Sequence, residues 1–303
     1  MSDDRRAGFF IVGAPKCGTT AMDYYLSQHP EIFIAPKKET HFFATDLLPV
    51  DDPARDPHRY AALFTGMGHE KIAGESSVFY MLSRQAAANI HAYNSAAKII
   101  VHLRNPVDVL ASHHSQIVYE GLEPIEDFEV ALGAEATRRQ NLPAPTRILR
   151  VPQVLLYTDV VKFTEQIKRF LDQFGREQVH INVFDDLKAD VAGVYRRTLE
   201  FLDVDPGFKA EFPIINANKA VRSTAFRRFL KETPDWISAA SHLFSSRQTR
   251  VRLRRKLKKL NSQPVSRPPM APELRHRLCR QMAPEVESLS ALIGRDLTSW
   301  TRQ

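Results

Sequence analysis

The chain has 303 residues, of which 43% are hydrophobic and 9% aromatic, and these values are ordinary for a globular protein. With 42 Lys and Arg against 35 Asp and Glu, its formal net charge is +7. No apolar run reaches the ~18 residues of a membrane-spanning helix, and Cys17 and Cys279 form neither a disulfide pattern nor a zinc-binding pattern. The composition therefore excludes disordered, fibrous and membrane-spanning classes and allows one large domain or two small ones.

The positive charge is concentrated between residues 219 and 281, which carry 17 Lys or Arg and 3 acidic residues. Its densest part, residues 247–259, either forms a solvated helix face, which we favour, or contacts an anionic partner such as the inner membrane surface. We expect no nucleic-acid partner. The first ten residues, MSDDRRAGFF, lead into an apolar strand pattern without a signal-peptide core, which predicts a cytoplasmic protein with reduced thiols.

In chain order, short apolar segments alternate with helical patterns. Strands are predicted at residues 9–12, 71–74, 98–103 and 179–184, and helices at 21–29, from Pro106 onward, 155–174, 191–202 and 272–293. This alternation predicts a three-layer α/β fold, with a central, mainly parallel sheet flanked by helices and ligands bound beyond the carboxyl ends of the strands. We assign residues 1–220 to this core and 221–303 to a basic helical extension packed on the same domain.

The segment GAPKCGTT, residues 13–20, follows the first predicted strand and precedes the first predicted helix. Small residues let backbone N–H groups approach an anion, and Lys16, two threonine hydroxyls and the helix N-terminus add favourable charge and hydrogen bonds. This pattern predicts a phosphate-binding loop, whereas a simple glycine turn would need neither the lysine nor the threonines. Cys17 lies at the helix N-terminus, where a lowered pKa is expected, but we interpret it as a small loop residue.

Residues 9–20, FFIVGAPKCGTT, resemble the 5′-phosphosulfate-binding loop of sulfotransferases that use 3′-phosphoadenosine 5′-phosphosulfate (PAPS). Residues 99–116, IIVHLRNPVDVLASHHSQ, resemble the 3′-phosphate-binding element of these enzymes, in which an arginine is followed eight residues later by a serine. The resemblance implies PAPS as donor, 3′,5′-adenosine bisphosphate (PAP) as product and no need for a metal. It also implies a donor site formed by Pro15, Lys16, Cys17, Gly18, Thr19, Thr20, Arg104 and Ser112.

A second set of motifs concerns catalysis. By spacing alone, Glu39 would be a surface carboxylate that follows two lysines. However, KETHFF, residues 38–43, is similar to the Glu-x-His-Phe-Phe segment of heparan-type 3-O-sulfotransferases, whose glutamate is the catalytic base. The similarity implies that Glu39 is the base and that His41 orients it or lines the acceptor site. Ser76 stands where the heparan-acting enzymes carry a lysine, which argues against a glycosaminoglycan acceptor.

The resemblance thins beyond residue 206, although Lys219 and Arg222 lie in a segment similar to the late loop that closes over the nucleotide. Together the motifs imply transfer of a sulfuryl group from PAPS to a hydroxyl or amino group of a carbohydrate, lipid or other small acceptor. Such in-line transfer depends on positioning and electrostatics, with Lys16 stabilising the leaving phosphate. The acceptor walls are expected in residues 47–59 and 120–150.

Two other functions remain open at this stage. A P-loop kinase would bind Mg-ATP, but its loop would carry a lysine where Thr19 stands. A basic nucleic-acid or membrane-surface binding module would use residues 247–259, and its affinity would fall steeply with salt.

Overall fold

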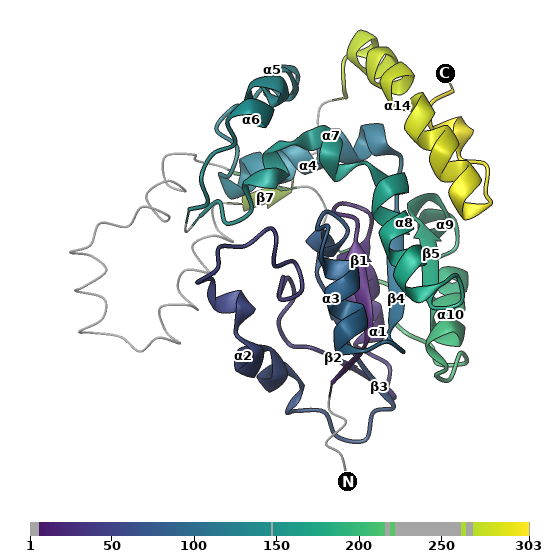
Figure 1. The fold of residues 1–303 in the computed structure, drawn as a ribbon. Helices are drawn as coiled ribbons and strands as arrows, with labels where there is room; N and C mark the ends of the chain where they lie inside the picture. The colour runs from purple at the N-terminus through teal and green to yellow at the C-terminus, as the bar shows by residue number, and fades with distance from the viewer. Residues whose placement is uncertain (1–5, 147, 216–218, 222–261, 265–268, 303) are drawn as a thin grey trace.

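The computed structural model describes residues 6–146, 148–215, 219–221, 262–264 and 269–302. Five strands form one parallel sheet in the order β2-β3-β1-β4-β5 (Figure 1). They are β1 (Ala7–Gly13), β2 (Ile32–Ile34), β3 (Ile72–Ser76), β4 (Lys98–Leu103) and β5 (Val179–Val183). The predicted parallel sheet with flanking helices is confirmed, and β1 lies at its centre, where its carboxyl end meets those of β3 and β4.

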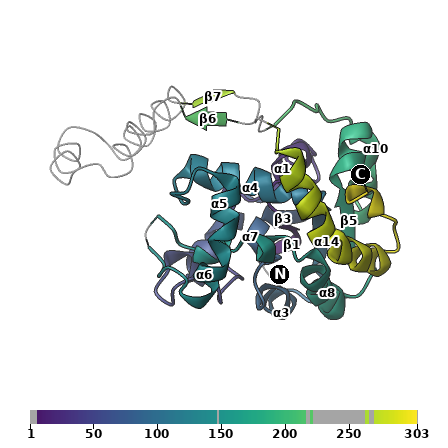
Figure 2. The ribbon, with the colours of Figure 1, turned by 90° about the horizontal axis from the view of Figure 1, so that it is seen from above.

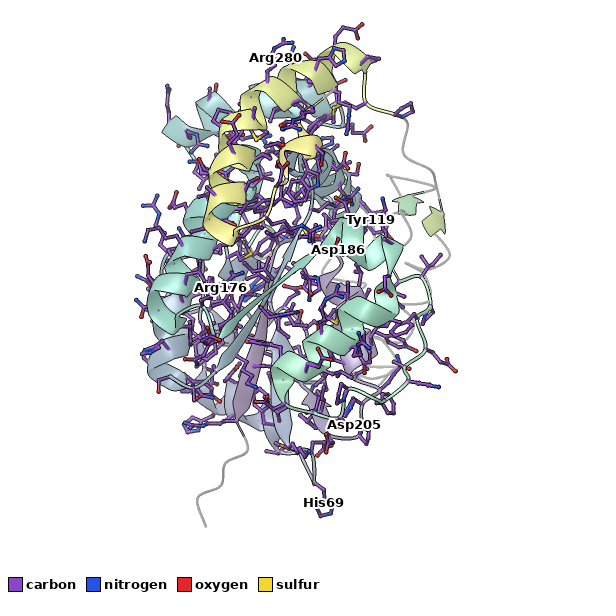
Figure 3. The ribbon with its side chains drawn as sticks, turned by 90° about the vertical axis from the view of Figure 1, so that its right-hand side faces the viewer. His69, Tyr119, Arg176, Asp186, Asp205 and Arg280 are labelled. Atoms are coloured by element: carbon purple, nitrogen blue, oxygen red, sulfur yellow. The ribbon has the colours of Figure 1, made fainter. Side chains whose placement is uncertain are left out.

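Helices cover both faces of this sheet (Figures 2 and 3). Alternate residues of β1 point to opposite faces, so Phe9 and Ile11 enter one core while Phe10 and Val12 enter the other. The first core is closed by α1 (Thr19–Leu26), α9 (Phe184–Ala189) and α10 (Val191–Leu202). The second core is closed by α3 (Ala86–Tyr93), α4 (Pro106–Glu120), α8 (Phe163–Phe174) and α14 (Pro272–Ile293).

The remaining elements are short. The α-helices are α2 (Pro57–Ala61), α5 (Phe128–Gly133), α6 (Glu135–Gln140) and α7 (Tyr157–Val160). The 3₁₀ helices are η1 (Pro53–Arg55), η2 (Ala62–Phe64), η3 (Val78–Tyr80), η4 (Pro152–Leu155) and η5 (Thr298–Trp300). An antiparallel pair is formed by β6 (Lys219–Val221) and β7 (Ser262–Pro264).

Two predictions of local structure need correction. The strand β2 was not predicted, and the predicted helix over residues 155–174 is wrong in its first half. There the chain forms the separate helices η4 and α7 before α8 begins at Phe163. The side chain of Gln166 donates a hydrogen bond from Nε2 to the carbonyl oxygen of Asp159 at 2.7 Å. This bond binds the end of α7 to α8 across the break.

The C-terminal segment contributes to the main core. Leu278 and Val286 of α14 are fully buried against α4 and α8. Beyond the helix, Asn105 donates from Nδ2 to the carbonyl oxygen of Trp300 at 2.8 Å, and the Trp300 indole donates to Asp185 at 2.7 Å. The basic residues 247–259 lie outside the described residues. No helix in the described part of the chain combines the length and apolar character that crossing a bilayer would require.

Candidate active site

The segment that joins β1 to α1 is tightly held. The Ala14 N–H donates to the carbonyl oxygen of His102 at 2.8 Å, which ties the segment to β4. Gly18 precedes α1 with a φ of 94°, and a Cβ at this position would lie 2.9 Å from the Leu187 side chain. Within the described residues no side chain caps α1, and the Ala21 N–H donates to the Gly18 carbonyl oxygen at 3.0 Å, which leaves the N–H groups of Thr19 and Thr20 for an anion.

Lys16 occupies this loop with a left-handed φ of 65° and a half-buried side chain. Its Nζ donates to Oε1 of Gln116 on α4 at 3.1 Å, and Nη1 of Arg104 donates to the Lys16 carbonyl oxygen at 3.3 Å. The loop, the end of β4 and α4 therefore meet around Lys16. Gln116 was not predicted as a site residue, and its only signal in the sequence is its place one turn after Ser112.

Arg104 directly follows β4. Its guanidinium lies over the Phe184 ring at 4.8 Å, and its Nη2 lies 3.7 Å from Oδ2 of Asp108. Ser112 is buried two turns further along, on α4. The structure thus brings Arg104 against the loop before α1 and places Ser112 on the helix that begins beside it.

The pKa of the Cys17 thiol differs from the lowered value expected from the sequence. Its side chain is fully buried, and Sγ donates to the carbonyl oxygen of Pro15 at 3.4 Å. Burial raises the pKa of Cys17 to about 12, although Arg104 and Lys16 act to lower it. The expected lowering of this pKa is therefore wrong because loss of solvent outweighs the nearby positive charges. A neutral thiol is no nucleophile.

The turn that carries Glu39 is strained and precisely fixed against the end of β3. Glu39 and His41 have φ values of 56° and 57°, a region that non-glycine residues rarely adopt. The Glu39 N–H donates to the Ser76 carbonyl oxygen at 2.9 Å, and the Val78 N–H donates to the Glu39 carboxylate at 3.0 Å. The half-buried carboxyl is thereby held in one orientation.

Burial raises the pKa of Glu39 to about 7, partly offset by the charge of Lys38 and the Val78 N–H, while Glu75 and Asp23 raise it further. A carboxylate with a pKa near neutrality can accept a proton efficiently at physiological pH. Its burial and fixed orientation therefore distinguish Glu39 from an ordinary surface carboxylate.

His41 lies beside Glu39 but does not contact it through a hydrogen bond in the described structure. Its ring stacks on Phe79 with centroids 5.4 Å apart, and its buried Nδ1 has no hydrogen-bond partner among the described residues. Burial, followed by the charges of Arg150 and Lys37, lowers the pKa of His41 to about 4. At neutral pH the imidazole is therefore uncharged.

Lys38 connects this turn to the loop before α1. Its Nζ donates to Oγ1 of Thr20 at 3.3 Å and lies 3.9 Å from the buried carboxylate of Asp23. The lysine was not predicted as a site residue, although its place beside Glu39 in the motif was a signal. Through it, the Thr20 end of the loop and the Glu39 turn are in direct contact.

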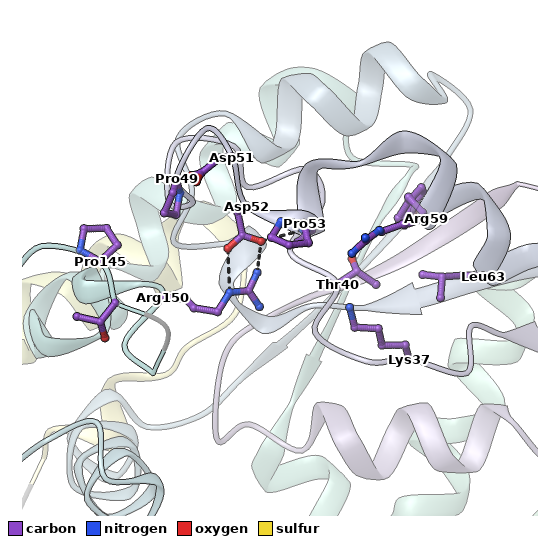
Figure 4. Close-up of a pocket in the computed structure, with 13 residues that line it drawn as sticks. Lys37, Thr40, Pro49, Asp51, Asp52, Pro53, Arg59, Leu63, Pro145 and Arg150 are labelled. Carbon is purple, nitrogen blue, oxygen red and sulfur yellow. Dashed lines mark hydrogen bonds and ion pairs between the residues drawn. The ribbon is translucent and has the colours of Figure 1, made fainter. Parts of the chain in front are cut away.

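A cavity of about 730 Å³ opens beside the same turn (Figure 4). Its wall includes Lys37 and Thr40 from the turn, together with segments near Asp52 and Tyr60 and the residues around Arg150. Arg150 donates from Nε to the Asp52 carboxylate at 2.9 Å and makes a second bond to it from Nη2. Most of the lining residues fall in the segments 47–59 and 120–150, in which the acceptor walls were expected, or follow the first of them at Tyr60 and Leu63. Lys37 and Thr40 belong to neither segment.

The structure describes the remaining predicted site residues in less detail. Pro15 and Thr19 are buried within the loop. Lys219 begins β6, but only the backbone is described there, and Arg222 lies outside the described residues. Ser76 is buried, and its Oγ has no hydrogen-bond partner in the described part of the chain. No group of three His, Cys, Asp or Glu among the described residues could hold a metal ion.

A parallel α/β sheet carries a glycine-containing loop and an acidic turn at its carboxyl edge, the place where ligands bind in α/β folds of this class. The sulfotransferase domain model matches residues 6–215. The crystal structure of a sulfotransferase from Alicyclobacillus acidocaldarius is similar, with a TM-score of 0.73 and 31% identity, covering 98% of this chain and 99% of that one. The chain belongs to the sulfotransferase family.

Curated relatives include the membrane-associated sulfotransferase kil1 of Dictyostelium discoideum, 34% identical over 36% of this chain and 23% of that protein. The mouse heparan sulfate glucosamine 3-O-sulfotransferase 5 is 24% identical, with 65% of this chain and 53% of that protein covered. The mouse carbohydrate sulfotransferase 15 is 25% identical, with 65% and 44% covered. The matched region therefore spans about half or less of each of these relatives.

Proposed function

We propose that this sulfotransferase transfers a sulfuryl group from PAPS to a hydroxyl or amino group of a carbohydrate or another small acceptor. The observation that carries the proposal is the contact between Lys38 and Thr20. It joins the anion-binding loop to the turn that holds Glu39, so a donor in the loop and a base in the turn would face the same reacting group. Relatives named for carbohydrate substrates support this acceptor class.

The residues present fit the two anionic ends of PAPS. The uncapped first turn of α1, Lys16 and the hydroxyls of Thr19 and Thr20 would hold the 5′-phosphosulfate. Arg104, which already contacts the loop, would bind the 3′-phosphate together with Ser112. A guanidinium is suited to this task because its planar donors match phosphate oxygens.

In the proposed reaction, Glu39 takes the proton of the acceptor hydroxyl as the acceptor oxygen forms its bond to sulfur. The bond between sulfur and the 5′-phosphate oxygen breaks, and the Lys16 ammonium neutralises the charge that gathers on that oxygen. His41, which is uncharged at neutral pH, would orient the acceptor or the base. The proton ends on Glu39 and the electron pair on the departing PAP.

Nucleotide binding tests this proposal and separates it from its alternatives. The thermal unfolding of the protein is measured with PAP, with 5′-AMP and with Mg-ATP. A ligand at 100 times its dissociation constant stabilises the native state by about 2.7 kcal/mol, so PAP is expected to raise the Tm by several degrees and 5′-AMP to raise it less. A shift with Mg-ATP alone would support the kinase, and no shift with any nucleotide would turn attention to residues 247–259.

The cavity beside the Glu39 turn is the proposed acceptor site, and Arg150 tests it. Replacing Arg150 with methionine removes the ion pair with Asp52 that shapes its wall. We expect the KM for acceptor to rise about tenfold, with the PAP-induced Tm shift unchanged. Arg139→Met is the matched control, because Arg139 is equally exposed and pairs with Asp159 away from the cavity. An equal rise in KM in both variants would contradict this placement.

A further inference from the structure

Glu75 is a buried acid that the proposed reaction does not use. It lies one residue before the end of β3, is 1% exposed and forms no ion pair among the described residues. Its carboxylate instead accepts hydrogen bonds from hydroxyl groups. The donors are Thr40 at 2.9 Å, Ser77 at 3.0 Å, Tyr60 at 3.4 Å and Tyr80. A buried acid satisfied only by hydroxyls is costly to keep, which calls for a reason beyond packing.

Two of these hydroxyl groups act on the turn of the proposed base. Thr40 stands between Glu39 and His41, the two residues with left-handed backbone. Its side chain points inward to Glu75, and its hydroxyl also lies 2.9 Å from that of Tyr80. On the other side, Ser77 accepts a hydrogen bond at 3.3 Å from the His41 N–H while it donates to Glu75. The carboxylate therefore holds the middle of this strained turn through Thr40 and its His41 end through Ser77.

The same network reaches the proposed acceptor cavity. Thr40 and Tyr60 both line the cavity, and both donate to Glu75. The Tyr60 ring stacks on Phe42, with ring centroids 4.2 Å apart, and so fixes the residue that follows the turn. Glu75 thus lies behind the Thr40 and Tyr60 side chains that line the cavity. It is connected to Glu39 through Thr40, the next residue in the chain.

We propose that Glu75 is a positioning residue, which holds the Glu39 turn at the end of β3 so that the Glu39 carboxylate stays beside the acceptor cavity. The proposal rests on the proposed function, because it assigns Glu75 to the support of that base. The physical reason is that two left-handed residues cost free energy, which the hydroxyls gathered on Glu75 offset. Small displacements of a catalytic group lower the rate strongly.

The chain offers a close match for a control. Tyr80 is fully buried and donates its hydroxyl to Glu75, whereas Tyr157 is fully buried and donates its hydroxyl to Glu123. The carboxylate of Glu123 is held by Arg138 rather than by a catalytic turn. Tyr80→Phe and Tyr157→Phe therefore remove the same chemical group from equally buried acids, and neither tyrosine contacts the proposed donor residues in the described structure.

The test measures two properties in each variant, the hydrogen exchange of residues 36–44 and the release of PAP from PAPS with water as acceptor. In the second assay the sulfur–oxygen bond to the 5′-phosphate breaks, a water oxygen bonds to sulfur, and sulfate, PAP and the two protons of the water are formed, one of which stays on the 5′-phosphate below its second pKa of about 6. For Tyr80→Phe we expect about tenfold faster exchange in that segment and about 10- to 100-fold slower PAP release, with the PAP-induced Tm shift retained. For Tyr157→Phe we expect neither change.

A second pair of variants covers the case in which Tyr80→Phe does not fold. Thr40→Val keeps the shape of the side chain and loses the hydroxyl, whereas Thr40→Ser keeps the hydroxyl. We expect the valine variant to match the Tyr80→Phe result, and the serine variant to keep the wild-type hydrogen exchange of residues 36–44. Unchanged exchange in Thr40→Val, or equal effects in Tyr80→Phe and Tyr157→Phe, would overturn the role of Glu75. A wild-type protein that neither binds PAP nor cleaves PAPS would instead overturn the proposed function.

Discussion

Replacing Lys16 with alanine is expected to lower PAPS-dependent sulfuryl transfer by about 10²–10³-fold, the loss seen when one preorganised group that stabilises a developing charge is removed. Lys16 is the cation of the loop before α1, and its Nζ already reaches across to Gln116. The bridging oxygen of the donor gains charge as its bond to sulfur breaks, so the interaction is stronger in the transition state than with bound donor. The measurement is kcat with saturating PAPS, together with the Tm shift produced by PAP.

Lys71→Ala is the matched control for this variant. Lys71 pairs with Glu31 and precedes β3, at the amino edge of the sheet, opposite the loop. In Figure 3, His69 marks the end of the molecule where the segment before β3 lies, and Asp186 of α9, the helix that follows β5, lies far from it. The control changes the net charge equally but is expected to leave kcat and the PAP-induced shift within about twofold of wild type. Equal losses in both variants would show that overall charge, not Lys16, attracts the donor.

The central strands β1 and β4 could be predicted because each contains a continuous apolar run. In β4, the five residues from Ile99 to Leu103 are all buried, as expected of a central strand covered on both faces. β2 gave no such signal, because it has three residues and begins two positions after Pro30. It becomes a strand only through its pairing with β3, which depends on residues 40 positions away.

The break between α7 and α8 shows a second limit of prediction from the sequence. Helical periodicity continues through residues 155–174, yet Tyr157 and Phe163 are both fully buried in the same core. In a straight helix, the side chains of Tyr157 and Phe163 would point to different sides of the helix, so both could not enter this core. The chain instead turns at Lys162, where ψ is 61°. Tertiary packing therefore overrides a local preference for helix.

At the candidate site, the motifs predicted a set of residues but not how those residues meet. Lys16 and Arg104 could be named from short segments because each follows a predicted strand, whereas Glu39 could be named only through the resemblance of residues 38–43 to a known motif. The contact of Lys38 with Thr20 and the network on Glu75 could not, because they join residues 18 and 35 positions apart. Such contacts depend on the register of β3 against β1, which no single segment contains.

Replacing Glu39 with glutamine is expected to lower kcat by about 10²–10⁴-fold, the usual range for a general base, and to leave the PAP-induced Tm shift unchanged. Glu200→Gln, at an exposed position on α10, is the control and should keep wild-type activity.

The pH dependence of kcat provides an independent check. Because the pKa of Glu39 is raised to about 7, wild-type kcat should fall about tenfold per pH unit below that value, as the base becomes protonated. A kcat that stays level down to pH 5 would contradict this assignment.

The same pKa predicts an effect on stability of opposite sign to that on activity. Since the pKa of Glu39 is higher in the folded protein than its ordinary value of 4.5, its contribution to stability is complete below pH 4.5 and is lost as the pH rises through about 7. Glutamine has no charge to lose, so the Glu39→Gln variant should match wild type at pH 4 and exceed its free energy of unfolding at pH 8. Urea unfolding at both pH values measures the difference, and a variant less stable than wild type at pH 8 would show that the turn favours the ionised carboxylate. Greater stability with lost activity would mark Glu39 as a residue kept for chemistry at a cost to the fold.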